Sequence, residues 1–290
     1  MNRLLVPLLA GLVLLAGLAI VIAALYGMAA SRYDVTGLAR AVPVSTAMMR
    51  QRADEARRDG HRYAIDQRWV PYGRISPLLR RAVLIAEDDA FFSHDGLDWN
   101  EMRAALRRNV RAGRIVRGGS TITQQLARNL YLGNARTLTR KLEEIAIARR
   151  LEGALNKRRI FELYLNLIEW GDGIFGIEAA ARRHFGVAAA SLDPRQAALL
   201  AAVIINPRRW DPAHPSRRIE SRARMILGRM AARGFITHDE FLAATGGARL
   251  HHGLFDWLFG GGGSPSAPAD TGVTAPTAGD SSAALPDSLP

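Results

Sequence analysis

A ten-residue segment, 87–96, concentrates ionisable side chains in a way that suits proton transfer. Its acidic and basic members are Glu87, Asp88, Asp89, His94 and Asp95. Glu87 falls at the C-terminal end of an expected helix, where the macrodipole destabilises a carboxylate and tends to raise its pKa. Such a group could serve as a general base. The structural alternative is a helix stop, with Asp98 and Glu101 as the next capping box and two phenylalanines filling the core.

A second polar stretch, 118–129, joins a glycine pair to a helical pattern. Its apolar residues Ile122, Leu126 and Leu130 lie four apart and predict one buried face. The opposite face, at about 100° per residue, carries Thr121, Gln124, Gln125 and Arg128. Uncharged hydrogen-bonding groups together with one cation suit a sugar phosphate. The alternative is an amphipathic helix for which Thr121 and Gln124 serve only as a capping box.

A third group, Arg140, Lys141 and Glu144, lies in a helical pattern that runs to Glu152. Arg140 and Glu144 are four residues apart, so they share a helix face. On a solvated face such a pair contributes about 0.3 to 0.5 kcal/mol. From spacing alone, a surface ion pair is the default interpretation.

Helix start and stop signals predict the elements that position these groups. Ser76 as N-cap, with Pro77 at the first helical position, predicts a helix that runs to about Glu87. Further helices are expected at 46–59, 99–112, 140–152, 156–167, 177–185, 197–204, 216–233 and after Thr237. Three glycines between 171 and 176 predict a tight loop. No convincing strand alternation is present, so the fold should be mainly α-helical.

Composition narrows the class of protein. With 290 residues, 48% of them hydrophobic, the chain has enough apolar side chains for a real core, which excludes disorder throughout. It has no cysteine, so disulfides and thiolate metal sites are excluded. The net charge of +12 favours anionic partners such as phospholipid headgroups, pyrophosphates or nucleic acid.

The N-terminal run from Leu4 to Ser31 contains no charged residue. A helix of this length, at about 1.5 Å per residue, crosses a hydrocarbon core of about 30 Å. We therefore predict a cytoplasmic stub and transmembrane anchor over 1–31. A cleavable signal peptide with a site near Gly27 is the alternative, although its apolar core would be unusually long.

Two further segments have a distinctive composition. Five arginines between 107 and 117, close to a spanning helix, favour contact with anionic lipid, and the glycines around them predict a mobile loop. Beyond Phe259 the chain is rich in Gly, Pro, Ser and Ala, which cannot bury enough surface to order itself. The expected organisation is thus an anchor at 1–31, a folded domain at 32–250 and a disordered tail at 251–290.

Five stretches resemble, in order, the signatures of the peptidoglycan glycosyltransferases, lysozyme-like enzymes that occur alone or fused to penicillin-binding domains. GGSTITQQLARNLYL resembles the second signature, segment 87–96 the first, and Arg-Lys-x-x-Glu at 140–144 the third. YLNLIEWGDGIFGIEAAARRHFG is similar to the fourth, in the form typical of stand-alone enzymes, and the helix before Asn206-Pro207 to the fifth. The resemblance covers about residues 65–215, and too few residues follow for a penicillin-binding domain.

This resemblance implies a mainly α, lysozyme-like, two-lobed helical glycosyltransferase domain behind one N-terminal transmembrane helix. It also implies a reaction in which the 4-hydroxyl of one lipid-linked disaccharide attacks the anomeric carbon of another chain. That centre is inverted and undecaprenyl pyrophosphate is expelled, so that lipid II is polymerised into glycan strands.

The resemblance also assigns site residues, position by position. Glu87 matches the family's base and Glu144 its second acidic catalytic position. Arg128, Arg140 and Lys141 match the cations that hold the pyrophosphate. Supporting substrate-binding positions are Asp88, Phe91, His94, Ser120, Thr121, Gln125 and Asn129. One departure is Arg128, where the family usually has lysine, and a guanidinium fork is not equivalent to an ammonium point charge.

The same resemblance implies lipid II and the growing glycan chain as substrates, with no nucleic acid as a partner. It implies a single-pass protein of the bacterial inner membrane with a periplasmic catalytic domain, and proteins of cell-wall synthesis or division are candidate partners. No metal ligand and no certain cofactor are implied, and a requirement for Mg²⁺ is left open.

Two other classes of function compete with this interpretation. A muramidase or lytic transglycosylase, which cuts glycan strands, shares the kind of fold and also relies on a glutamate. Cutting glycan needs no cations for a pyrophosphate, which argues against it. A basic, membrane-anchored binding protein without catalysis would leave segment 87–96 as a mere loop.

Overall fold

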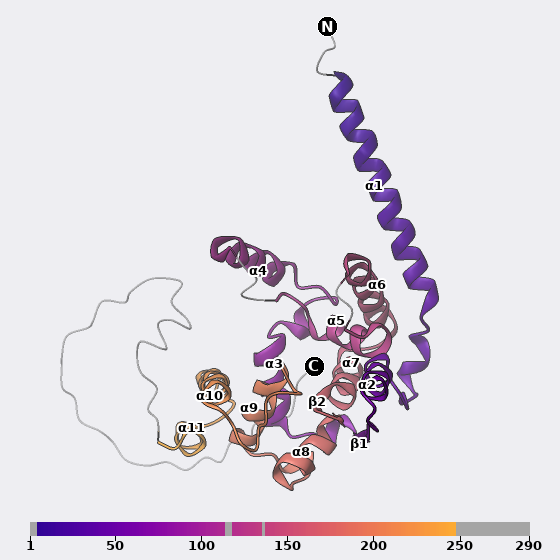
Figure 1. Ribbon diagram of the computed structural model, residues 1–290. Coiled ribbons are helices and arrows are strands. Elements are labelled where there is room, and N and C mark those ends of the chain that lie inside the picture. The colour runs from indigo at the N-terminus through magenta and orange to yellow at the C-terminus, as the bar shows by residue number, and fades with distance from the viewer. Residues whose placement is uncertain (1–4, 114–117, 135–136, 248–290) are drawn as a thin grey trace, which may run out of the picture. The chain divides into compact units, whose positions relative to one another are not determined.

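Helices form most of the chain in the computed structural model, which describes residues 5–113, 118–134 and 137–247 (Figure 1). The predicted tail at 251–290 and most of the predicted mobile loop lie outside the described residues. The longer helices are α1 Leu5–Arg32, α2 Ala47–Arg58, α3 Pro77–Glu87, α4 Trp99–Ala112, α5 Ile122–Ala127, α6 Leu138–Ala154, α7 Lys157–Leu167, α8 Ile177–Phe185, α9 Pro194–Val203, α10 Arg217–Ala232 and α11 His238–Thr245. Short helical turns are η1 Thr36–Ala39, η2 Tyr72–Arg74, η3 Phe91–Ser93, η4 Arg128–Leu132 and η5 Ala189–Ser191.

The prediction of a mainly helical fold is confirmed, and most helices begin at the capping residues that the sequence indicates. Side chains of Thr46, Thr137 and Asn156 each accept a backbone N–H of the first turn. Capping boxes open α5, α9 and α11. Ser76 is an exception, because its hydroxyl makes no capping bond and donates instead to the carbonyl of Leu192. The predicted N-cap position of Ser76 and first helical position of Pro77 are confirmed, although the Ser76 side chain makes no capping bond.

The tight turn expected between 171 and 176 is present at Asp172-Gly173, and it joins two of three short strands that the sequence pattern did not indicate. Strand β2 (Glu169–Gly171) pairs antiparallel with β3 (Ile174–Phe175), and β1 (Asp66–Gln67) pairs parallel with β3, in the order β1-β3-β2. Strands of two or three residues are too short to show an alternating pattern, so no local signal indicates them. The sheet fixes the end of α7 against the segment that leads into α3.

The core is built where α5 packs against α6 and α7, and where α3 packs against α9 and α10. Its largest fully buried side chains include Trp170, Tyr164, Phe91, Phe161 and Phe175. In Figure 1, α5 and α7 lie in the middle of the folded part, with α3, α9 and α10 beside them. The apolar face predicted for α5 is confirmed, because Ile122 and Leu126 are fully buried.

A buried amide ties α7 to the chain that precedes α3. Asn166 is fully buried, and its side-chain oxygen accepts the backbone N–H of Val70 at 2.8 Å while its amide nitrogen donates to the Val70 carbonyl at 2.9 Å. These bonds satisfy backbone groups that burial would otherwise leave unpaired.

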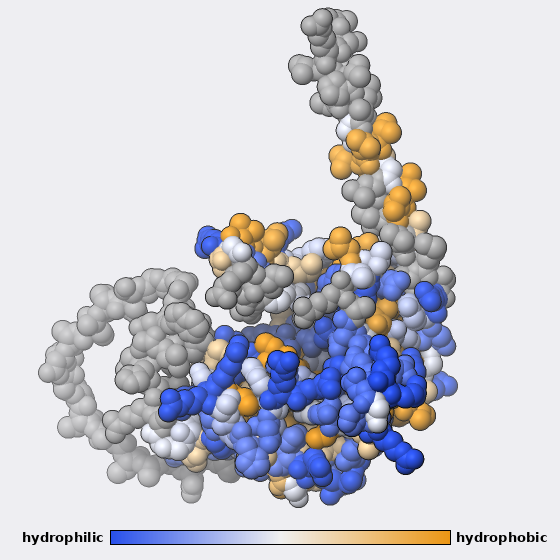
Figure 2. All heavy atoms as spheres, viewed as in Figure 1, coloured by the Kyte–Doolittle hydropathy of each residue, from blue (hydrophilic) through white to orange (hydrophobic). Residues whose placement is uncertain are grey.

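Exposed apolar side chains gather on α1 and α4. On α4, Trp99, Leu106 and Val110 lie on one face and are more than half exposed. Figure 2 shows this hydrophobic surface on α4 and a second one along α1. Among the residues that the structure describes, no helix combines the length and hydropathy required for a membrane span.

Gly176, between β3 and α8, offers a test of the packing around this sheet. Its φ is +80°, and a Cβ placed there would lie 2.6 Å from the carbonyl oxygen of Asn166. Gly186 serves for comparison, with φ +70° and ψ 10° and no atom within 4 Å of such a Cβ, whereas ψ of Gly176 is 150°, which adds strain of its own. We expect Gly186→Ala to cost about 1 kcal/mol through left-handed strain alone. Gly176→Ala should cost about 1 to 3 kcal/mol more because the backbone must move.

The measurement is urea denaturation of the two variants beside the unchanged protein. Equal destabilisation by both substitutions would contradict the close approach of Gly176 to α7.

Candidate active site

Glu87 ends α3 at a point where three other helices converge. Its side chain is 13% exposed. One carboxylate oxygen accepts the side-chain amide N–H of Gln125 from α5 at 3.0 Å, and the other accepts Arg222 from α10 at 3.2 Å. The amide oxygen of Gln125 in turn accepts the hydroxyl of Tyr164 from α7 at 3.0 Å. The carboxylate expected as a base is therefore largely buried and hydrogen-bonded at both oxygens.

Burial raises the pKa of Glu87 above its ordinary value, while the Gln125 hydrogen bond and the positive charges of Arg222 and Arg128 act in the opposite direction. A raised pKa agrees with the expectation from the sequence. The cause differs, because desolvation contributes most, whereas the sequence argument relied on the helix macrodipole. A carboxylate with a raised pKa is a stronger proton acceptor once ionised, which suits a general base.

A cavity of about 470 Å³ adjoins this carboxylate through Gln125, which lines its wall. Four arginines, from α2, η4, α6 and the segment after α9, line the same cavity: Arg52, Arg128, Arg140 and Arg208. Amide side chains complete the polar lining, namely Gln125, Asn129, Asn134 and Asn206. Guanidinium and amide N–H groups around one space suit a phosphorylated or pyrophosphorylated ligand.

Arg128 and Asn129 belong to a π-helical turn, η4, and not to a continuous α-helix. Within it, the N–H of Gly133 donates to the carbonyl of Arg128 five residues earlier. Turns of this kind occur often at functional sites. In the described part of the chain the buried Nε of Arg128 has no hydrogen-bond partner. The buried Nε of Arg140, which lines the same cavity, likewise has no partner among the described residues.

Glu144 is buried, with 2% of its side chain exposed, and it holds two cations at once. Arg140 donates to one of its oxygens at 2.6 Å and Lys141 pairs with the other. Lys141 also donates to the hydroxyl of Ser120 at 3.1 Å. The surface ion pair inferred from spacing alone is wrong for this site, because a solvated pair would leave Glu144 exposed.

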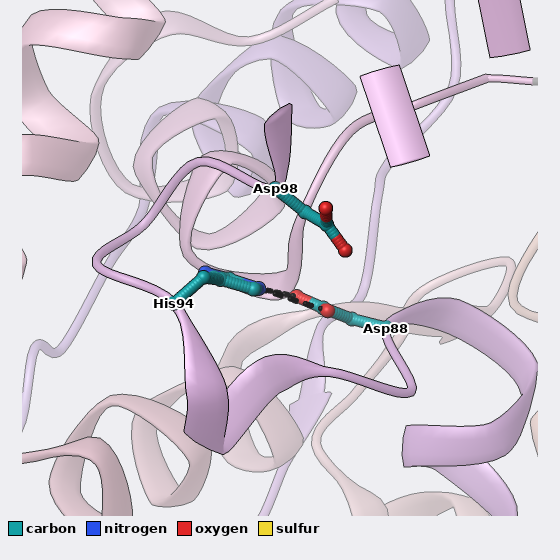
Figure 3. A group of neighbouring side chains, drawn as sticks. All are labelled: Asp88, His94 and Asp98. Atoms are coloured by element: carbon teal, nitrogen blue, oxygen red, sulfur yellow. Dashed lines mark hydrogen bonds and ion pairs between the residues drawn. The ribbon is translucent and has the colours of Figure 1, made fainter. Parts of the chain in front are cut away.

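Asp88 and His94 lie against each other (Figure 3), and neither of them lines the cavity. Asp88 accepts His94 Nε2 at 3.0 Å and the backbone N–H of Ile122, at the start of α5, at 2.9 Å. Thr121 is buried, and its hydroxyl donates to the carbonyl of Gly96 at 2.7 Å. These contacts fasten segment 88–96 to the N-terminus of α5.

Phe91 is fully buried against Phe161 and also contributes to the core. The predicted substrate contacts of Asp88, His94, Thr121 and Phe91 stay predictions, and the geometry gives these four residues a supporting position. Of the polar face predicted for α5, Gln125 and Arg128 line the cavity, whereas Gln124 is buried in the capping box.

Asp88, His94 and Asp98 each offer a ligand atom, and these atoms lie within 4.8 Å of one another. Over the described ranges no other such group is found. The trio does not fit Mg²⁺, because that ion prefers an octahedral shell of oxygen ligands and keeps several waters. Both oxygens of Asp88 are also already engaged as acceptors, and Asp98 accepts the N–H of Glu101.

Sequence analysis missed several residues of this region. Arg222 lies in a helix interpreted only as basic and amphipathic, and Glu169, which accepts Arg52 through both oxygens, lies in a segment interpreted as scaffold. Arg52 and Arg208 were not selected either. No local pattern marks these side chains, since their partners lie far away in the chain.

Comparison with known proteins agrees with this geometry. The family model described as Transglycosylase matches residues 55–231. A biosynthetic peptidoglycan transglycosylase of Nitrosospira multiformis is 46% identical over 190 residues, which is 66% of this chain and 83% of the relative. Proteins with the same name from Aromatoleum aromaticum and Methylobacillus flagellatus are each 50% identical over 188 residues, 65% of this chain and 81% and 82% of theirs.

The family model covers more than half of the chain, and the alignments extend over most of each relative. The matched region contains α3, α5, α6 and most of α10, which carry Glu87, Gln125, Glu144 and Arg222. The chain therefore belongs to the transglycosylase family.

Proposed function

We infer that this protein is a peptidoglycan glycosyltransferase of cell-wall synthesis, which polymerises lipid II into glycan strands. The observation that carries the inference is the position of Glu87, a buried carboxylate joined through Gln125 to a cavity with four arginines. A glycan-cutting muramidase needs a glutamate but no cations for a pyrophosphate. The relatives' name is also that of biosynthetic enzymes, so glycan cutting is not favoured.

In the proposed reaction Glu87 accepts the proton of the 4-hydroxyl while that oxygen attacks the anomeric carbon of the other chain. The bond between this carbon and the pyrophosphate oxygen breaks with inversion, and its electron pair leaves with undecaprenyl pyrophosphate. A positioned base of this kind contributes typically about 10² to 10⁴ in rate.

We assign the leaving pyrophosphate to the cationic wall of the cavity. Arg128 and Arg140 line it, and preorganised positive charge stabilises the negative charge that develops as the bond breaks. Glu144, which pairs with Arg140 and Lys141, orients these two cations. Asn129 and Ser120 supply neutral hydrogen-bonding groups beside them.

The membrane anchor is also a proposal. Helix α1 is 28 residues long, and the run from Leu4 to Ser31 is uncharged. Its described apolar side chains, such as Leu14 and Ile20, are largely exposed. The substrate carries a lipid tail, so an anchor in the inner membrane would keep a periplasmic catalytic domain next to it.

Glu87→Gln separates binding from chemistry, because the amide keeps the size of the side chain but cannot take up a proton. We expect the variant to fold and to bind lipid II, with the initial rate of glycan formation lowered about 10²-fold to 10⁴-fold. Added substrate should not restore the rate. Asp54→Asn, at an exposed ion pair on α2, is the control and should retain full activity.

The measurement is the initial rate with labelled lipid II, beside a melting curve for each variant. A Glu87→Gln protein that keeps more than roughly a tenth of the rate would remove Glu87 from its proposed role.

Charge reversal at Arg140 should be worse than charge removal, because a carboxylate adds repulsion of the pyrophosphate to the lost contact. We expect Arg140→Ala to lower the rate roughly 10²-fold and Arg140→Glu to lower it further. Arg128→Lys should retain most activity. Arg149→Glu, exposed on the same helix α6, is the matched control and should leave the rate nearly unchanged.

The rates are compared in one lipid II assay. If Arg140→Glu and Arg149→Glu behaved alike, Arg140 would have no part in holding the leaving group.

Removal of residues 1–31 should lower activity on detergent-free liposomes, because an anchored enzyme meets lipid II by diffusion in two dimensions. The same truncation assayed in detergent micelles is the control, and there the loss should be much smaller. Undiminished turnover on liposomes at equal protein concentration would show that the segment is not needed as an anchor.

A further inference from the structure

The amide of Gln125 lies between Tyr164 and Glu87 and is polarised by both. Its oxygen accepts the Tyr164 hydroxyl at 3.0 Å, and its nitrogen donates to Glu87 at 3.0 Å. A side-chain amide has a donor end and an acceptor end, so its function depends on which end faces the carboxylate. If the amide were turned round, its oxygen would face the oxygen of an ionised Glu87 and repel it.

In the described chain, the hydrogen bond from Tyr164 is the one side-chain contact that fixes this orientation at the oxygen end of the amide. The side chain of Gln125 makes its hydrogen bonds with Tyr164 and Glu87, while the neighbouring Asn129 bonds to the backbone carbonyl of Gln125. Tyr164 is well suited to hold the amide, because its ring is fully buried in α7 and stacks on Phe161.

Burial raises the pKa of Tyr164 well above its ordinary value, so the phenol keeps its proton at neutral pH. Its hydroxyl is therefore available as a donor. An ionised Glu87 only accepts hydrogen bonds, so the amide must turn its N–H toward Glu87 and its oxygen toward Tyr164. The Tyr164 hydroxyl then donates to that oxygen, and no two acceptors face each other.

We propose that Tyr164 is a positioning residue for the glycosyl transfer, which holds the Gln125 amide so that its N–H faces the catalytic carboxylate. In the described part of the chain Tyr164 makes no hydrogen bond to Glu87 and does not line the cavity, so it acts through Gln125. The inference rests on the proposed function, in which Glu87 is the base.

Other charged groups near Glu87 also act on this carboxylate. Arg222 approaches from α10, Arg128 lies on η4, and Asp88 follows Glu87 in the chain. Removal of the Tyr164 hydroxyl leaves these side chains chemically unchanged, and the Gln125→Ala variant tests whether its effect passes through the amide.

The sign of the effect follows from the hydrogen bond. An N–H that faces a carboxylate favours its charged form, so loss of this orientation raises the pKa of Glu87 further. A base is active only when deprotonated, so the acidic limb of the pH profile moves to higher pH. Activity is lost on the acidic side and recovered on the alkaline side.

The test is Tyr164→Phe in the full chain, with the pH dependence of kcat/KM measured on lipid II. We expect the acidic limb to move upward by about one pH unit, which makes kcat/KM about tenfold lower below the limb. Tyr72→Phe is the matched control, because Tyr72 is also buried and contacts Phe161 but lies on η2. It should leave the limb in place.

A double variant shows whether Tyr164 acts through the amide. Gln125→Ala alone should move the limb in the same direction, and adding Tyr164→Phe should move it no further. A limb that stays in place in Gln125→Ala would overturn the proposal even if Tyr164→Phe failed to fold. A Tyr164→Phe enzyme that is slower at every pH with an unmoved limb would also overturn it, because that result indicates a structural role.

The unchanged enzyme and Glu87→Gln, run in the same series, separate this inference from the proposed function. If the unchanged enzyme forms no glycan, the proposed function fails, and if Glu87→Gln keeps the same rate and limb, the role of Glu87 as the base fails. If Glu87→Gln behaves as expected but Tyr164→Phe matches Tyr72→Phe, only the positioning role fails.

Discussion

A buried carboxylate base must remain close to several cations without being neutralised by them, and this constraint governs the arrangement of the site. An arginine bound directly to both oxygens of Glu87 would stabilise its charge and make it a weak base. Here one oxygen accepts the neutral amide of Gln125 and only the other meets a cation, Arg222. Gln125 thus places a neutral donor at one oxygen, while Arg128 of the cavity acts on the carboxylate through its charge.

The cations have constraints of their own, because like charges around one space repel one another unless carboxylates compensate. Glu144 holds Arg140 and Lys141, and Glu169 holds Arg52 through both oxygens. Arg128 has a buried nitrogen without a partner in the described residues. The compensated arginines are therefore positioned before a ligand arrives.

The surrounding helices and loops position Glu87 and Gln125 by holding the N-terminus of α5 in place. Asp88 accepts the first N–H of that helix and His94 at the same time, while Thr121 is bound to the carbonyl of Gly96. The segment after α3 and the start of α5 are thereby fastened together. Glu87 and Gln125 lie on these two elements, so the distance between them is set by contacts behind the cavity.

The sequence by itself determined the helices, the buried face of α5 and the segments that supply Glu87, Gln125, Arg128 and Glu144. These follow from local information, namely capping residues and apolar spacing, and from motifs read in order along the chain. The π turn at η4, the short strands and the burial of Glu144 were decided by tertiary packing. So were the contacts of Arg222 and Tyr164 with the Glu87 region, whose partners lie 135 and 39 residues away along the chain. No local pattern encodes such pairings, because they exist only once the helices have packed together.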